Sequence, residues 1–121
     1  MASFVIDSDM FKDQYGTPEM RAVFSDEQLM QNWLNAWVAL AEAETELGIV
    51  PKEAGEHIRK CAKWENMNMD EVRKGFFPTS HPLMPQIRGF EKVCGKKAGG
   101  YIHWGATTQD IMDTAVVLQI K

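Results

Sequence analysis

Apolar residues recur every three or four positions along most of the chain, the spacing that gathers them on one face of an α-helix. The longest such stripe begins after Ser25, which forms a capping-box pattern with Gln28, and ends at Gly48, a residue typical of helix C-termini. Its members are Leu29, Met30, Trp33, Leu34, Trp37, Val38, Leu40, Ala41 and Leu47, with Glu44 on the same side. We expect one long helix here, with an apolar face broad enough to contact both its own core and a partner.

Shorter helices are predicted before and after this one. Thr17 followed by Pro18 is typical of a helix start, because the hydroxyl caps free N–H groups and proline fits the first turn. Residues 51–63 form a second helical pattern that opens on a proline. Asn68 and Glu71 form another capping-box pattern ahead of an apolar segment, which predicts a third helix.

Ser80 is expected to cap a further helix that begins near Pro82 and runs to the glycines at 99–100. Pro85 would lie in the first turn of that helix, where a missing N–H costs little. No alternating strand pattern is longer than residues 101–103, and the chain has no internal repeat. The predicted fold is therefore a compact all-α domain.

A last helix is predicted to begin near residues 107–110, with Ile111, Ala115 and Leu118 along one side. Its other sides are apolar as well, through Met112, Val116, Val117 and Ile120. A helix that is apolar on several faces belongs inside a larger bundle. We therefore expect this chain to be the N-terminal part of a longer protein.

Composition narrows the class of protein. The chain has 121 residues, 45% of them apolar and 25% charged, which suits one soluble globular domain. It has no apolar run long enough to cross a bilayer and no signal-like start, and Cys61 and Cys94 lack metal-ligand spacing, so we expect free thiols and a cytoplasmic location. A net charge of −4 argues against nonspecific nucleic-acid binding.

The segment at residues 103–110, HWGATTQD, carries the candidate chemistry. Gly105 lets the backbone approach a ligand, and Thr107 and Thr108 place hydroxyls where a helix begins. The free N–H groups of a helix start favour a carboxylate or phosphate, and His103 adds a possible cation or proton donor. The alternative is a threonine-capped helix that follows a tight turn and has no ligand.

The same segment, with the IMDTA that follows it, resembles the His-x-Gly-x-Thr-Ser-x-Asp motif of the fumarase/aspartase superfamily. The match is closest to the adenylosuccinate lyase and 3-carboxy-cis,cis-muconate cycloisomerase branch. Residues 15–21 (YGTPEMR) and 79–85 (TSHPLMP) match further segments in the same order. The resemblance implies an N-terminal helical lyase domain at residues 1–106 and the start of a central-bundle helix at 107–121. It also implies a homotetramer in the full-length protein.

The resemblance further implies the reaction. These enzymes remove a proton next to a carboxylate and eliminate a group from the adjacent carbon, releasing fumarate, and the cycloisomerases form a lactone by a related addition. Such chemistry needs a base, donors that hold the aci-carboxylate, and an acid for the leaving group. The implied substrate is a small polycarboxylate. By resemblance, Thr107 and Thr108 would bind its carboxylate and His103 would lie beside its anionic end.

Two earlier segments supply the remaining candidates by resemblance. Ser80, His81 and Pro82 occupy a segment that contacts substrate in these lyases, and His81 could donate a hydrogen bond or act as an auxiliary acid. Gln14 and Tyr15 align with the pair that holds the nucleotide phosphate in adenylosuccinate lyases. That pair is usually Arg-Tyr, and glutamine lacks the charge and forked geometry suited to phosphate. The departure lowers the expectation of adenylosuccinate as the substrate.

The chain also departs from the family in other respects. Residues 112–121 look more like the muconate cycloisomerases, although many of those lack a histidine where His81 stands. The later Gly-Arg-Thr-His segment and the loop with the catalytic serine are absent, so this chain is expected to be inactive alone. We expect no cofactor, metal, nucleic acid or membrane partner. The alternative function is a helical oligomerisation module without chemistry.

Overall fold

The computed structural model describes residues 4–121, and every regular element in that range is helical. The elements are η1 (Val5–Asp7), α1 (Lys12–Tyr15), α2 (Pro18–Val23), α3 (Asp26–Glu46), α4 (Lys52–Cys61), η2 (Trp64–Asn66), α5 (Met69–Thr79), α6 (Met84–Ala98), η3 (Gly99–Tyr101) and α7 (Thr108–Ile120), where η marks a short 3₁₀ turn. The all-α prediction is confirmed. No helix within residues 4–121 combines the length and apolar character that a membrane span requires.

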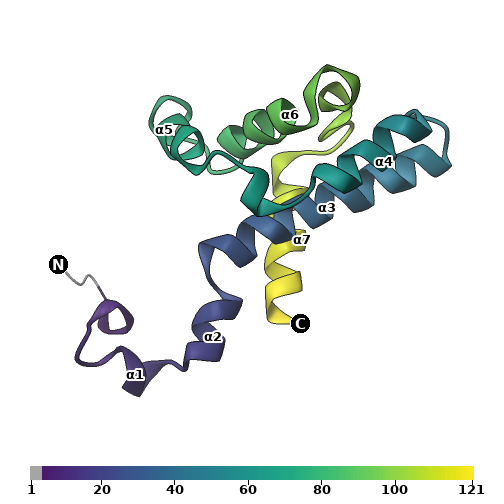
Figure 1. The fold of residues 1–121 in the computed structure, drawn as a ribbon. Coiled ribbons are helices and arrows are strands. Elements are labelled where there is room, and N and C mark those ends of the chain that lie inside the picture. Colours follow the sequence, from purple (N-terminus) through teal and green to yellow (C-terminus); the bar gives the residue numbers. More distant parts are fainter. Residues whose placement is uncertain (1–3) are drawn as a thin grey trace.

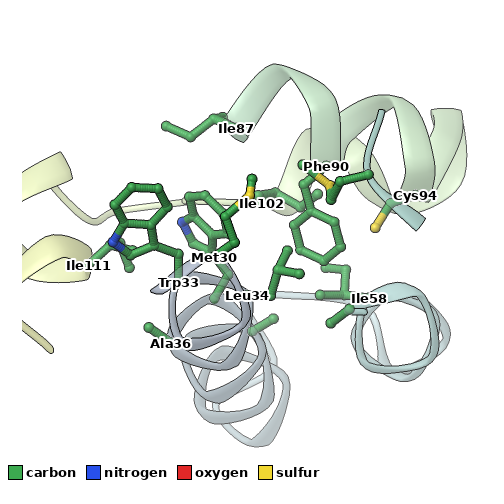
Figure 2. Packing of buried hydrophobic residues seen from close by; sticks show 14 of the residues in the cluster. Met30, Trp33, Leu34, Ala36, Ile58, Ile87, Phe90, Cys94, Ile102 and Ile111 are labelled. Atoms are coloured by element: carbon green, nitrogen blue, oxygen red, sulfur yellow. The ribbon is translucent and has the colours of Figure 1, made fainter. Parts of the chain in front are cut away.

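Helix α3 is the centre of the fold, and α4 and α7 both pack against it. Helix α6 closes the other side of the core through its contacts with α4 and α5 (Figure 1). Trp37 of α3 is 1% exposed and stacks on Phe90 of α6, with ring centroids 5.8 Å apart. Side chains from α3, α4 and α6 converge with Ile102 and Ile111 in this cluster (Figure 2). Each large apolar side chain buried there stabilises the fold by about 1.5–3 kcal/mol.

The N-terminal caps predicted for three of the helices are present. Thr17, Ser25 and Asn68 each accept a hydrogen bond from the backbone N–H three residues further on, at 3.2 Å. These bonds satisfy donors that have no partner inside a helix. Gly48 follows the long helix with φ +74°, a conformation that glycine adopts without strain. The start and end of α3 therefore follow from its sequence.

Ser80 does not cap α6, so that prediction is wrong. Ser80 instead ends α5 in the left-handed conformation, with φ +49°, and its N–H donates to the carbonyl of Phe76 at 2.8 Å. Helix α6 begins later, at Met84, and its N-cap residue Leu83 makes no side-chain cap. The serine was misplaced because α5 extends further than its capping pattern alone indicates. Pro85 does lie in the first turn of α6.

The buried face of helix α7 contains fewer of the predicted residues than expected. Ile111, Ala115 and Gln119 are buried, at steps of four residues, whereas Leu118 is 42% exposed and does not belong to the buried side. Met112 is half-buried and packs against the core, whereas Val116, Val117 and Ile120 face outward and are 45%, 63% and 71% exposed. A large apolar surface on α7 is thus uncovered in this chain.

The first three elements, η1, α1 and α2, extend away from the rest of the molecule and contain no buried residue (Figure 1). We call residues 4–24 the arm. Its exposed apolar side chains are Phe4, Val5, Ile6, Met10, Phe11, Tyr15, Met20, Val23 and Phe24. One hydrogen bond joins it to α7, from Gln119 Nε2 to the carbonyl of Val23 at 3.0 Å.

Candidate functional site

The start of α7 is closed by a reciprocal cap. Thr107 is extended, its backbone N–H donates to Asp110 Oδ2 at 3.0 Å, and its carbonyl accepts from the Asp110 N–H at 3.2 Å. The carboxylate of Asp110 also lies in the first turn, where the helix dipole favours negative charge. Asp110 was not predicted as a capping residue, although the Thr-x-x-Asp spacing is visible in the sequence. Thr107 is exposed and Thr108 half-buried, so both remain open to solvent.

The turn before this helix is anchored to α3. Trp37 Nε1 donates to His103 Nδ1 at 3.2 Å, and the two rings meet edge to face at 88°. In neutral His103 the proton therefore sits on Nε2, which is left as the donor. Burial lowers the pKa of His103, while the charges of Asp110 and Glu91 oppose the shift. The imidazole thus favours its neutral form and offers one N–H.

Glu44 lies beneath the same turn and was not predicted as a site residue. Its side chain is 8% exposed, and burial raises the pKa of its carboxyl. A Cβ atom added at Gly105 would lie 3.7 Å from Glu44 Oε1, and Gly105 has φ +70°. The distance is an ordinary contact, and the positive φ is what makes glycine the suitable residue at this point of the turn. The only sequence signal for Glu44 was its place within an apolar stripe.

The turn between α5 and α6 holds the second group of candidates. His81 is half-buried, and its Nδ1 accepts from the backbone N–H of Leu83 at 3.1 Å, so its Nε2 also carries the proton in the neutral ring. Ser80 and Pro82 are exposed. Ser80 and His103 are the two non-glycine residues with positive φ between residues 4 and 121. A left-handed residue costs about 1–2 kcal/mol, and such strain concentrates at functional sites.

Gln14 and Tyr15 lie in α1, which is far from the start of α7 and from the α5–α6 turn (Figure 1). Both side chains are exposed. Arg21 shapes the turn that follows them, because its Nη1 donates to the carbonyls of Lys12 and Gly16 at 3.2 and 3.1 Å. This chain by itself therefore does not bring the pair to the other candidates.

The two turns that carry His81 and His103 pack on the same hydrophobic core but make no direct polar contact with each other. Leu83 and Ile102, which neighbour the two histidines, belong to one hydrophobic cluster. Over residues 4–121 no hydrogen bond connects His81 with His103, Thr107 or Thr108. No group of three potential metal-ligating side chains occurs in the same part of the chain. What the turns offer together is a set of hydrogen-bond donors.

Comparisons with known proteins agree with this architecture. The sequence is 41% identical over 121 residues to N-acetyl-S-(2-succino)cysteine lyase of Dickeya dadantii (strain 3937), covering 100% of this chain and 26% of that protein. It is 44% identical over 108 residues to adenylosuccinate lyase of Methanocaldococcus jannaschii, covering 89% of this chain and 23% of the relative. The 3-carboxy-cis,cis-muconate lactonizing enzyme from Pseudomonas putida superposes with a TM-score of 0.85 at 33% identity, covering 93% of this chain and 26% of that one.

The chain spans about a quarter of the length of the relatives it matches. No family model matches it. The relatives are more than 30% identical to this chain over most of its length, and the solved structure shares its helical fold. These findings indicate the same family as the HWGATTQD, TSHP and YGTPEMR segments. The chain belongs to the fumarase/aspartase superfamily, in the branch of the adenylosuccinate lyases and carboxymuconate cycloisomerases.

Proposed function

We propose that this chain is the N-terminal part of a lyase or cycloisomerase and contributes the groups that bind a substrate carboxylate. The reaction of the whole enzyme would be β-elimination of fumarate from a substituted succinate, or the related lactonisation of a carboxymuconate. Residues 1–106 would form the helical lyase domain, and residues 107–121 would begin a longer bundle helix. In this proposal the enzyme is a cytoplasmic homotetramer, and the chain alone has no activity.

The observation that carries the proposal is the open start of α7. Thr107 and Thr108 are not sealed in the core, and they stand at the N-terminus of a 13-residue helix. The Thr107 side chain makes no cap hydrogen bond, so its hydroxyl is free to donate to a carboxylate. His103, whose ring is oriented by Trp37 and whose neutral form is favoured by burial, supplies a second donor nearby in the chain. Preorganised donors of this kind stabilise the negative charge that develops on the carboxylate.

The proposed substrate carries a succinyl group but no phosphate. Gln14 stands in the position that the resemblance assigns to phosphate binding, and it has no positive charge to offer. Among the similar proteins, two are named as lyases of N-acetyl-S-(2-succino)cysteine, a name that denotes a succinate group attached through sulfur. We therefore place this class of compound ahead of adenylosuccinate and carboxymuconate.

Carboxylate binding can be tested on the chain as it stands. Titration with fumarate or succinate, followed by amide NMR, should shift the resonances of Gly105, Thr107 and Thr108. The Thr108→Val variant should lose most of the response, and Thr108→Ser should keep it. Shifts spread over unrelated surface amides, or an unchanged response in Thr108→Val, would remove the basis for the proposed site.

The role of His81 is tested in the longer protein that the proposal requires. The His81→Ala variant should lower the elimination rate by roughly 10²–10⁴-fold, the usual contribution of a positioned acid–base group. The matched control is His57→Ala, since His57 is exposed and lies on α4. A loss below about threefold, compared with that expected range, would exclude an acid–base role for His81.

Substrate class is decided by assaying three compounds in parallel: N-acetyl-S-(2-succino)cysteine, adenylosuccinate and 3-carboxy-cis,cis-muconate. We expect the thioether to have the highest kcat/KM. Gln14→Arg should lower the KM for adenylosuccinate and leave the KM for the thioether unchanged. If the unmodified protein had a higher kcat/KM for adenylosuccinate than for the thioether, the interpretation that Gln14 disfavours a phosphate-bearing substrate would be wrong.

The exposed apolar faces of α7 and the arm favour a second function, a helical oligomerisation module without chemistry. The sequence that follows Lys121 separates the two hypotheses. A serine-rich loop containing Lys-Asn supports the enzyme, and its absence supports the module.

A further inference from the structure

The two cysteines of the chain lie on either side of the contact between α4 and α6. Cys61 is the last residue of α4, and Cys94 lies in α6, which packs against α4. The sulfur of Cys94 points toward α4 (Figure 2). Cys61 packs against the same core cluster, close enough to Cys94 for the two thiols to interact. Both thiols are free. We propose that Cys61 and Cys94 form an oxidisable pair, in which a hydroperoxide attacks Cys61 and Cys94 then closes a disulfide between the two helices.

The two thiols differ in a way that sets the order of the steps. Cys61 is half-exposed, and its Sγ lies 3.5 Å from Nε2 of the exposed His57, which can accept the thiol proton. Cys94 is 3% exposed, and burial raises its pKa to about 12. Because the thiolate is the reactive form, a solvent oxidant meets Cys61 first and leaves Cys94 as the resolving thiol.

The backbone at both cysteines can adjust to disulfide geometry. A disulfide needs Cα atoms about 4.4–6.8 Å apart and a specific dihedral, so rigid helix interiors often prevent it. Cys61 ends α4, and Cys94 directly precedes Gly95, which leaves helical geometry with φ +65° and ψ −172°. A Cβ atom at Gly95 would meet nothing within 4 Å, so the break in α6 has free space around it.

The proposed steps balance without a metal or cofactor. The Cys61 thiolate attacks one oxygen of hydrogen peroxide, the O–O bond breaks, and a sulfenic acid forms. The hydroxide that leaves takes up the proton that the thiol released and becomes water. The Cys94 thiol attacks the Cys61 sulfur, the S–S bond forms, and a second water leaves. The pair loses two electrons and two protons to the peroxide, and an external dithiol returns both by thiol–disulfide exchange.

The test counts thiols in the 121-residue chain after treatment with hydrogen peroxide under native conditions. We expect both thiols to disappear together, the mass to fall by two hydrogen atoms, and the chain to stay free of intermolecular disulfides. A dithiol reductant should restore both thiols. Peptide mapping should identify one cross-link, between residues 61 and 94.

Two variants distinguish the steps. Cys94→Ala should stop at a sulfenic acid on Cys61 that dimedone labels, and Cys61→Ser should leave Cys94 reduced at the same peroxide dose. The same treatment in urea should slow the intramolecular reaction, because the native fold no longer holds the thiols together. The proposal is overturned if the folded chain keeps one thiol while Cys61 is overoxidised, if the product is an intermolecular dimer, or if the cross-link forms only in urea.

Discussion

His103 shows how a single residue connects the core to the candidate site. Its Nδ1 accepts from Trp37, a residue 66 positions earlier that also stacks on Phe90. The imidazole is therefore fixed in one orientation and one tautomer by the most buried part of the molecule. The backbone of His103 is left-handed, with φ +63°, and this strain persists because the ring is held.

This arrangement predicts a pH-dependent loss of stability. Burial lowers the pKa of His103 in the folded chain, so the unfolded chain binds the proton first as pH falls. Well above the histidine pKa of the unfolded chain, about 6.5, His103 has no effect on the free energy of unfolding. As pH falls from that value to the lowered pKa of the folded chain, His103 lowers the free energy of unfolding. Urea unfolding across this range should show the loss in the unmodified chain. His103→Asn, which keeps an acceptor and tolerates positive φ, should reduce that slope. Equal slopes would contradict the prediction.

The bond between Thr107 and Asp110 leads to a second prediction. The Asp110 carboxylate accepts the N–H of Thr107 at 3.0 Å, and it lies in the first turn of α7, where the helix dipole favours negative charge. Asp110→Ala removes both interactions and should lower the free energy of unfolding by about 1 kcal/mol. Asp110→Asn keeps a hydrogen-bond acceptor and should lower it less. Chemical denaturation measures both variants, and an equal loss in the two would show that the hydrogen bond is not a stabilising interaction.

Among the helices, the boundaries that carry a local signal were predictable and those set by packing were not. Thr17, Ser25 and Asn68 occupy their predicted cap positions because each bond involves residues three apart. Ser80 was misplaced, since its role depends on how far α5 continues. The outward position of Leu118 likewise depends on the angle at which α7 packs on α3, which no local pattern encodes.

Two helix glycines test the close packing of α5 on α6. A Cβ atom at Gly75 would lie 2.9 Å from Cβ of Pro85, whose ring cannot move aside. At Gly89 the nearest atom, also at 2.9 Å, is the flexible end of Met67. Alanine gains up to about 1 kcal/mol of helix propensity at either position. Overpacking of a rigid contact costs about 1–3 kcal/mol, so Gly75→Ala should still destabilise the chain, by up to roughly 2 kcal/mol net.

Gly89→Ala is the matched control for that substitution. Its free energy of unfolding should be unchanged or slightly raised, because the methionine tip can adopt another rotamer. Thermal or urea unfolding compares the two variants directly. If Gly75→Ala proved the more stable of the two, the α5–α6 contact would be looser than the structure indicates.

At the scale of the whole molecule, the uncovered apolar surfaces are the dominant feature. Val117 and Ile120 on α7 and the side chains of the arm leave a surface that water solvates poorly. We expect the isolated chain to self-associate as its concentration rises, measured by sedimentation velocity. Replacing Val117 and Ile120 together with glutamate should shift it toward the monomer without changing its helical circular dichroism. A chain that stays monomeric at every concentration would contradict this expectation.

The residues of the candidate site could be predicted from the sequence, but the tertiary contacts that hold them in place could not. The HWGATTQD and TSHP segments stand out in the sequence, and their histidines lie on turns as expected. The bond from Trp37, the cap from Asp110 and the position of Glu44 beneath Gly105 are set by tertiary structure. Gln14 and Tyr15 lie apart from the other candidates within this chain, so their assigned role stays a proposal.

The single hydrogen bond between Gln119 and Val23 has a consequence for handling the protein. Because this one hydrogen bond holds the arm to α7, a brief chymotrypsin digestion should remove the arm. Phe24, which is 54% exposed and directly precedes the cap of α3, is the natural point of cleavage. The resistant remainder would begin at Ser25 and retain every buried side chain of the core, a shorter and better-behaved sample for crystals or spectra.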